Sequence, residues 1–274
     1  MQGINNQPYL INTPWVQCPK IDKVSDILSN TEVPNFVRGS GKAFVRLRKL
    51  ENKYREWVKD IVDLSEFIHC YFVNGVTDAI NQWVATETRS WQYLEGDYEY
   101  ANMISNRGNK VTYINSSDVL YISNPACATG NFIELKDLPN PIILDCAYLG
   151  STRKQKMYIP KTTEQIWFSF SKGWGLIGQR AGLVFTKQPH KSLEPMKQSE
   201  AWNYTSVEIA LAVIDNFDID TVYNQYRDKQ LKICKENNFT PADCFFIANS
   251  TSTEYSKRRR INNIARLNIG NLLK

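Results

Sequence analysis

A lysine at the end of an apolar run is the residue of this sequence best placed for covalent chemistry. Lys172 follows residues 166–170 (Ile-Trp-Phe-Ser-Phe), a segment typical of a buried strand. An amine at the rim of a sheet is partly desolvated, and in its neutral form it can attack a carbonyl to give a Schiff base. Ser169 offers a hydroxyl to an anion, and Arg180 offers a planar cation. Together these side chains suggest a cofactor that carries an aldehyde and a phosphate.

A carboxylate also stands at the end of an apolar run. Asp145 follows residues 141–144 (Pro-Ile-Ile-Leu), which predict a buried strand. A buried charge without a partner is unfavourable by several kcal/mol, so such a carboxylate needs a cation or shifts its pKa. Taken alone, the segment is better explained by an aspartate that caps a turn.

A glycine turn follows a third apolar segment. Residues 67–73 predict a strand, and Asn74-Gly-Val-Thr-Asp78 then opens a helix. The start of a helix presents free backbone N–H groups and the positive end of the helix dipole, which favour a phosphate. A single turn of this kind is a weak signal.

In combination these motifs resemble one enzyme family. Ser169-Phe-Ser-Lys172, followed by Gly-Leu-Ile-Gly-Gln-Arg180, is similar to the cofactor-lysine motif of fold-type I, pyridoxal-phosphate-dependent aminotransferases of class I/II. The turn at 74–78, the segment 124–130 and the segment 141–148 resemble three further motifs in the family's order. The resemblance covers roughly residues 40–190 and a segment near the C-terminus.

The resemblance implies roles around the cofactor ring and phosphate. Lys172 would hold pyridoxal 5'-phosphate as a Schiff base and act as the catalytic base. Asp145 would keep the ring nitrogen protonated, and Tyr148 would hydrogen-bond the ring oxygen. With Lys172 downstream behind one more strand, as in the family, this role for Asp145 is favoured over the turn cap. The phosphate would be held by Gly75, Val76, Thr77, Ser169 and Arg180.

Two other roles have simple structural alternatives. In the family an aromatic residue stacks on the ring, and Tyr98 matches that position, although Tyr98 and Tyr100 can equally pack a loop against the body. Arg266, in the segment 264–269, would bind the substrate α-carboxylate with its planar fork. An arginine on an exposed strand explains Arg266 equally well.

The sequence departs from the family in the turn at 124–130. Asn-Pro-Ala-Cys-Ala-Thr-Gly replaces Asn-Pro-x-Asn-Pro-Thr-Gly, so Cys127 stands where an asparagine would hydrogen-bond the ring hydroxyl. A thiol is a poor substitute for an amide donor. Either Cys127 lies beside the ring, or Asn124 takes over.

Hydrophobic periodicity predicts the elements that position these residues. Apolar residues at helical spacing predict a helix over 43–64, and further helices are expected over 206–217 and 219–237. Strands are expected at 67–73, 91–95, 111–114, 119–123, 141–144, 166–170, from 183, at 244–248 and at 264–269.

This alternation predicts an α/β fold, a three-layer α/β/α domain around a mostly parallel sheet, with ligands at the carboxyl ends of its strands. We expect an irregular N-terminal arm over 1–40, a large cofactor-binding domain over 41–190 and a small, shortened α+β domain over 191–274. In the family a partner-chain tyrosine reaches the phosphate; the corresponding neighbourhood here, 35–38, has none.

Composition narrows the class of protein. The chain has 274 residues, an apolar share of 42%, a net charge of +5 and six cysteines. That apolar share is ample for a buried core. The cysteines show no metal-ligand spacing, and no segment resembles a signal peptide or a membrane helix, so we expect a cytoplasmic protein with reduced thiols and no bound metal. The basic run 257–260 is interpreted as a solvated turn or an anion-facing rim, not as a nucleic-acid site.

The leading hypothesis is an aminotransferase that moves an amino group between an amino acid and a 2-keto acid and, as the resemblance implies, works as a homodimer. A decarboxylase or lyase of amino acids on the same fold is the alternative, because these enzymes share Lys172, Asp145 and Arg180. A catalytically idle binding protein of the same fold is a third reading, which intact Lys172 and Asp145 disfavour. The sequence does not identify the amino donor.

Overall fold

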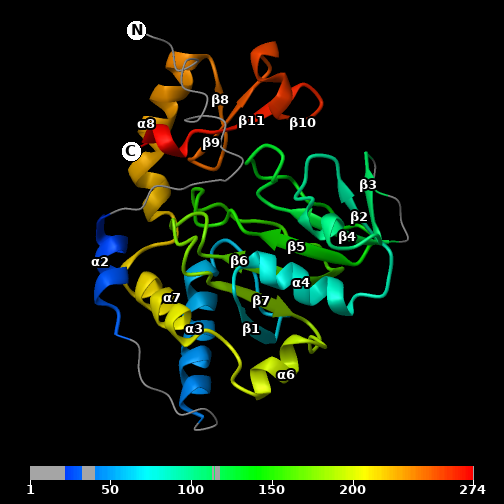
Figure 1. Cartoon of the computed structure of the whole chain (residues 1–274), viewed down its shortest axis with the longest axis vertical. Coiled ribbons are helices and arrows are strands. Elements are labelled where there is room, and N and C mark those ends of the chain that lie inside the picture. Colours follow the sequence, from blue (N-terminus) through cyan, green and yellow to red (C-terminus); the bar gives the residue numbers. More distant parts are fainter. Residues whose placement is uncertain (1–21, 33–40, 113, 115–117, 274) are drawn as a thin grey trace.

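The structure, a computed structural model, describes residues 22–32, 41–112, 114 and 118–273. A seven-stranded sheet lies at its centre (Figure 1). Its strands are β1 (His69–Val73), β2 (Trp91–Leu94), β3 (Gly108–Val111), β4 (Val119–Ser123), β5 (Ile142–Cys146), β6 (Thr163–Ser169) and β7 (Gly182–Thr186). The order is β1-β7-β6-β5-β4-β2-β3. Neighbours from β6 through β3 are parallel, and β7 pairs antiparallel with β6 and β1. The predicted, mostly parallel α/β sheet is confirmed.

Helices cover both faces of this sheet (Figure 1). The helices of the structure are α2 (Asp22–Asn30), α3 (Lys42–Val58), α4 (Val76–Thr86), α5 (Tyr100–Met103), α6 (Leu193–Gln198), α7 (Tyr204–Asn216) and α8 (Thr221–Asn237). Of these, α2 packs on α7, and α8 packs against strands that follow it in the chain. Successive residues of a strand face opposite sides, so β6 contacts both layers. Phe168 packs on Tyr54 of α3 at 5.0 Å between ring centroids, and Trp167 packs on Trp83 of α4 at 5.8 Å. The fold is therefore the predicted α/β/α sandwich.

The long N-terminal helix follows from its hydrophobic spacing. Leu47, Leu50, Tyr54 and Val58 lie three or four residues apart and are all buried. The helix ends at Val58 and not at residue 64 as predicted. Backbone N–H groups at 59 and 61 bond three residues back, so the last turn tightens and the chain leaves the helix.

A second, four-stranded sheet follows α8 in the chain. Its order is β10-β11-β9-β8, with β8 (Thr240–Pro241), β9 (Ile247–Ser250), β10 (Arg259–Ile261) and β11 (Ile264–Asn268). The strand expected at 244–248 is displaced to β9, because Cys244 and Phe245 donate their backbone N–H groups to Gly130 and Ser151 and not to a neighbouring strand. The strand expected at 111–114 is likewise displaced, to β3.

The N-terminal arm is not wholly irregular, because α2 occupies residues 22–30 and buries Val24 completely. Residues 35–38, where a partner-chain phosphate contact was considered, lie outside the described residues. The domain boundaries at 40 and 190 remain predictions. Within the described residues, none of the helices has the length and apolar character needed to cross a membrane.

Candidate active site

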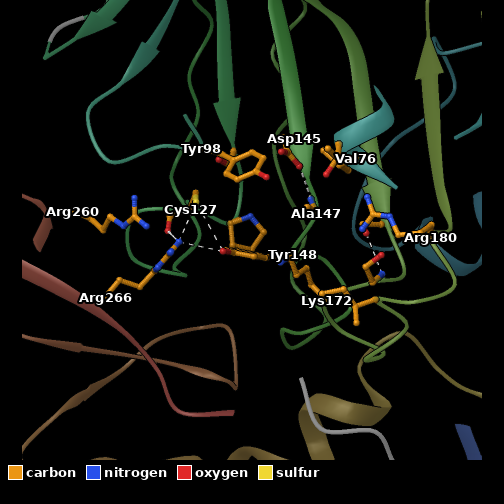
Figure 2. Close-up of a pocket in the computed structure, with 16 residues that line it drawn as sticks. Val76, Tyr98, Cys127, Asp145, Ala147, Tyr148, Lys172, Arg180, Arg260 and Arg266 are labelled. Carbon is orange, nitrogen blue, oxygen red and sulfur yellow. Dashed lines mark hydrogen bonds between the residues drawn. The ribbon is translucent and has the colours of Figure 1, made fainter. Parts of the chain in front are cut away.

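A cavity of about 230 Å³ opens at the carboxyl ends of β4, β5 and β6, beside the first turn of α4 (Figure 2). This volume suits a compact ligand and not a polymer segment. The sequence-predicted site residues that line the cavity are Val76, Thr77, Tyr98, Cys127, Asp145, Tyr148, Ser169, Lys172, Arg180 and Arg266. Gly75 lies immediately behind it as the N-cap of α4. The structure thus brings the predicted residues to one place, while their roles remain predictions.

One corner of the cavity is built for an anion. Gly75 has a φ of +78°, and a Cβ there would lie 3.0 Å from a terminal nitrogen of Arg180. Only glycine combines this backbone with so close an approach. The first backbone N–H groups of α4, at Val76 and Thr77, have no partner within the helix by their position. The guanidinium, these amides and the helix dipole therefore point positive charge at one spot.

Ser171 adds a donor to the cavity that the sequence analysis missed. Its hydroxyl oxygen is buried and has no hydrogen-bond partner among the described residues, and Ser171 lines the cavity. Its backbone N–H donates to the Ser169 hydroxyl at 3.1 Å. Buried hydroxyls are normally hydrogen-bonded, so this one is positioned to bind a ligand atom. Its place directly before Lys172 was the available signal.

Asp145 is a buried carboxylate with two donors. The Tyr121 hydroxyl donates to its Oδ2 at 2.7 Å, and the Ala147 N–H donates to its Oδ1 at 2.8 Å. Burial raises the pKa of Asp145 to about 6, against the lowering effects of these bonds and of the nearby Lys172 charge. A cation in the cavity would hold the carboxyl ionised. Tyr121, on β4, was not identified from the sequence.

Lys172 and Asp145 face the same cavity (Figure 2). Lys172 follows β6, and Asp145 lies near the end of the adjacent parallel strand β5. Their charges are close enough for the lysine to influence the carboxyl pKa. The amine and the carboxyl group therefore border one cavity.

Cys127 faces the cavity and Asn124 does not line it. Both ends of the Asn124 amide bond the backbone of Ile133, with Nδ2 donating to its oxygen at 3.1 Å and Oδ1 accepting from its N–H at 3.0 Å. The amide thus closes the turn and has no reach toward a ligand. Of the two alternatives left open by the sequence, the structure places Cys127 at the cavity.

Arg266 is tied to the same turn. Its Nη1 donates to the Cys127 carbonyl at 2.5 Å and lies 3.1 Å from the Cys127 sulfur and 3.3 Å from the Tyr148 hydroxyl. Burial raises the pKa of Tyr148 well above its usual value, so the phenol keeps its proton. All three contacts use Nη1 of Arg266, so its second terminal nitrogen is the one that can bind a carboxylate in the cavity.

Tyr98 lies over the cavity on a loop held by a buried carboxylate (Figure 2). Asp97 accepts hydrogen bonds from the Ser123 N–H at 2.9 Å, from the Ser123 hydroxyl, and from the Tyr98 N–H at 2.7 Å. The Tyr98 ring also stacks on the Tyr100 ring, with 6.1 Å between the ring centroids. The ring can therefore both pack the loop and present a face to a ligand. Asp97 was another residue missed from the sequence.

Arg260, from the basic run 257–260, also lines the cavity. It lies on β10, six positions before Arg266 on the neighbouring strand. The sequence analysis did not include it among the site residues. No group of three His, Cys, Asp or Glu side chains in the described part of the chain is arranged to hold a metal ion.

No family model matches the sequence, and no curated protein matches it. Solved structures do share its fold. A C-S lyase from Staphylococcus hominis, solved with pyridoxal phosphate bound, aligns with a TM-score of 0.71 at 13% identity, over 100% of this chain and 91% of that one. Histidinol-phosphate aminotransferase from Sinorhizobium meliloti, in complex with pyridoxal-5'-phosphate, aligns with a TM-score of 0.65 at 13% identity. The alignment covers 96% of this chain and 87% of that one.

L-threonine-O-3-phosphate decarboxylase from Porphyromonas gingivalis gives a TM-score of 0.63 at 14% identity, over 94% of each chain. The chain therefore has the fold of the fold-type I, pyridoxal-phosphate-dependent aminotransferases, as the motifs predicted. At these identities the comparisons establish the fold, and that fold carries more than one reaction.

Proposed function

We propose that this protein binds pyridoxal 5'-phosphate in the cavity and acts as an aminotransferase on an amino acid and a 2-keto acid. The observation that carries the proposal is that Lys172 and Asp145 face one cavity beside an anion site. An amine, a carboxylate and an anion site match the aldehyde, the ring nitrogen and the phosphate of this cofactor. The pyridoxal-phosphate complexes of this fold support the same choice.

The residues present fit the cofactor on three separate observations. Gly75 leaves room for the Arg180 guanidinium beside the start of α4, where a phosphate is favoured. The Ser171 hydroxyl is buried without a partner among the described residues. Asp145 is buried with a raised pKa, a state that a cationic nitrogen would relieve.

Each residue has a distinct task in the proposed reaction. Lys172 would hold the cofactor through Nζ and would serve as the base that takes the α-proton of the substrate amino acid. Pyridoxal phosphate supplies a protonated ring that draws electrons from the carbon losing that proton. Asp145 would be the ionised partner of the ring nitrogen, and the Tyr148 hydroxyl would donate to the ring oxygen. Arg266 binds the α-carboxylate and thereby orients the bond to be broken.

The remaining residues hold the cofactor in place. Arg180, Ser169 and Ser171 would hold the phosphate together with the Gly75-Val76-Thr77 turn. Tyr98 would cover the ring, and Cys127 would contact it where the family has an asparagine. We also propose that the protein works as a homodimer in the cytoplasm, as the family resemblance implies.

A decarboxylase or lyase of amino acids is the second candidate. Two observations favour it: Cys127 replaces the asparagine, and a C-S lyase and a decarboxylase share the fold. Product analysis separates the candidates. An aminotransferase requires a keto acid as acceptor, whereas a decarboxylase releases carbon dioxide and an eliminating lyase releases its leaving group without one.

Chemical capture of the cofactor tests the proposal directly. Purified protein is mixed with pyridoxal phosphate, reduced with borohydride and digested, and the labelled peptide is found by mass spectrometry. We expect the label on Lys172, and we expect the exposed-lysine variant K156A to be labelled as the wild type is. A label spread over surface lysines, or none, would refute the assignment and bring forward the idle binding protein.

A further inference from the structure

Two arginines approach the cavity from the C-terminal sheet. Arg260 on β10 and Arg266 on β11 belong to one antiparallel hairpin, and both line the cavity. Figure 2 shows them entering on the side away from Lys172 and Arg180. The hairpin therefore adds positive charge on the side of the cavity away from Lys172 and Arg180.

The backbone at Arg260 is held against the loop that carries Tyr98. A Cβ at Gly96 would lie 2.7 Å from the Arg260 carbonyl oxygen and 3.0 Å from the Ala128 Cβ, and Gly96 has a φ of +84°. A side chain at position 96 would push the β10–β11 hairpin away from the loop that carries Tyr98. The position of Arg260 is thus set by backbone packing, although its side chain is exposed.

The charges lining the cavity are unbalanced. Four of the lining residues, Lys172, Arg180, Arg260 and Arg266, are cationic, and Asp145 is the one carboxylate among the described residues that line it. Under the proposed function Lys172 binds the aldehyde, Asp145 the ring nitrogen, Arg180 the phosphate and Arg266 the α-carboxylate, so Arg260 is the charged lining residue without an assigned ligand group. Arg260 makes no hydrogen bond or ion pair with the described residues. A further anion would balance it.

We propose, building on the proposed function, that Arg260 forms a second anion subsite, so that the substrate is an amino acid with an anionic group on its side chain. The α-carboxylate would lie at Arg266, which is tied to Cys127 and Tyr148. The distal group would lie nearer solvent, at the exposed Arg260. A carboxylate and a phosphate both match the planar guanidinium fork.

Calorimetric titration with unreactive anions tests the subsite. Protein with excess pyridoxal phosphate is titrated with succinate, phosphonopropionate and butyrate, which lack the amino group and so bind without turnover. Succinate and butyrate have equal chain lengths and differ in the second carboxylate. We expect R260Q to weaken binding of the preferred dianion about 10- to 100-fold and butyrate less than about twofold. The tighter of the two dianions identifies the distal group.

Two further variants control the measurement. K257Q removes one positive charge from the same exposed run without touching the cavity, and it should keep the wild-type preference for dianions. R260K keeps the charge and loses the fork, and it should bind with intermediate affinity. Unchanged dianion binding in R260Q, equal loss of dianion and butyrate, or an equal loss in K257Q would each overturn the subsite.

The two proposals fail in different ways. If borohydride places no label on Lys172, the proposed function is wrong, whatever the titration gives. If Lys172 is labelled and the wild-type protein binds succinate, phosphonopropionate and butyrate alike, the cofactor assignment stands and the second anion subsite is refuted.

Discussion

The cavity has two sides of different construction. On the strand-end side, Asp145 is 3% exposed and receives a backbone and a phenol hydrogen bond, and Gly75 packs against Arg180. On the hairpin side, Arg266 is bound to a neighbouring turn and Arg260 is exposed. From this contrast we expect the strand ends to fix the groups that react and the hairpin to select which molecule reaches them.

The largest expected effect is on the strand-end side. K172A should lower turnover more than about a thousandfold, because both the attachment point and the base for the α-proton are removed. Keto-acid formation from a panel of amino donors gives the measurement, with K156A as the matched lysine control. If K172A remained active, the strand-end side would not carry the reacting groups, and the proposed division between a reacting side and a substrate-selecting side would be wrong.

The next effect concerns stability of the cofactor-free protein. Burial raises the pKa of Asp145 from 3.8 to about 6, so the folded state holds this proton more tightly than the unfolded state. The resulting stabilisation is complete below the unfolded value and is lost as pH rises through about 6, a change of about 3 kcal/mol. D145N lacks this dependence.

Denaturant unfolding of the wild type and D145N across that pH range measures the difference. We expect the wild type to lose stability relative to D145N as the pH rises. If the free energies of unfolding of the two proteins changed with pH in parallel, the Asp145 carboxyl would not be held in a desolvated site. The strand-end side would then be as open to solvent as the exposed Arg260 on the hairpin side.

A smaller effect is expected on the hairpin side. R266K should raise the KM for the amino acid about tenfold, since a lysine cannot bind a carboxylate through two parallel bonds. The affinity for pyridoxal phosphate should stay within about twofold. R153K, at an exposed arginine that bonds Gln155, is the control. Loss of cofactor affinity in R266K would show that the two sides do not divide their tasks.

The smallest effect comes from the donor to Asp145. Y121F removes a hydrogen bond that lowers the Asp145 pKa, so this pKa should rise further, by up to about one unit. The acidic limb of the pH profile of kcat/KM should move upward by the same amount. Y93F removes a buried phenol from the neighbouring strand and should leave the limb in place. If the pH profiles of kcat/KM were the same for Y121F and the wild type, the Tyr121 hydroxyl would not be lowering the pKa of Asp145.

The sequence predicted the strand-end side well for a physical reason. Parallel strands in an α/β sheet end at one edge, so polar residues that follow apolar runs converge there. This rule and the hydrophobic periodicity place Lys172, Asp145 and the turn at 74–78 at that edge, whereas the roles expected for them came from the family resemblance. The same periodicity located most strands of the seven-stranded sheet and the helices that pack on it, because their buried residues recur at regular spacing along each element.

Hydrophobic periodicity does not predict contacts that depend on where a hairpin folds back or on which rotamer a side chain adopts. Arg260 reaches the cavity only because a hairpin returns on Gly96, and the free hydroxyl of Ser171 depends on its rotamer. Asn124 folds back onto Ile133, which no motif spacing reveals. Cys244 and Phe245 are apolar in sequence, yet their N–H groups bond loops and leave them outside a strand.

The packing of Gly75 on Arg180 has an evolutionary consequence. The two positions lie far apart in the chain, yet one can gain bulk only if the other gives up its guanidinium or moves it. They should therefore change together: a related chain with a side chain at the first position should carry a shorter residue at the second and hold its anion by other means.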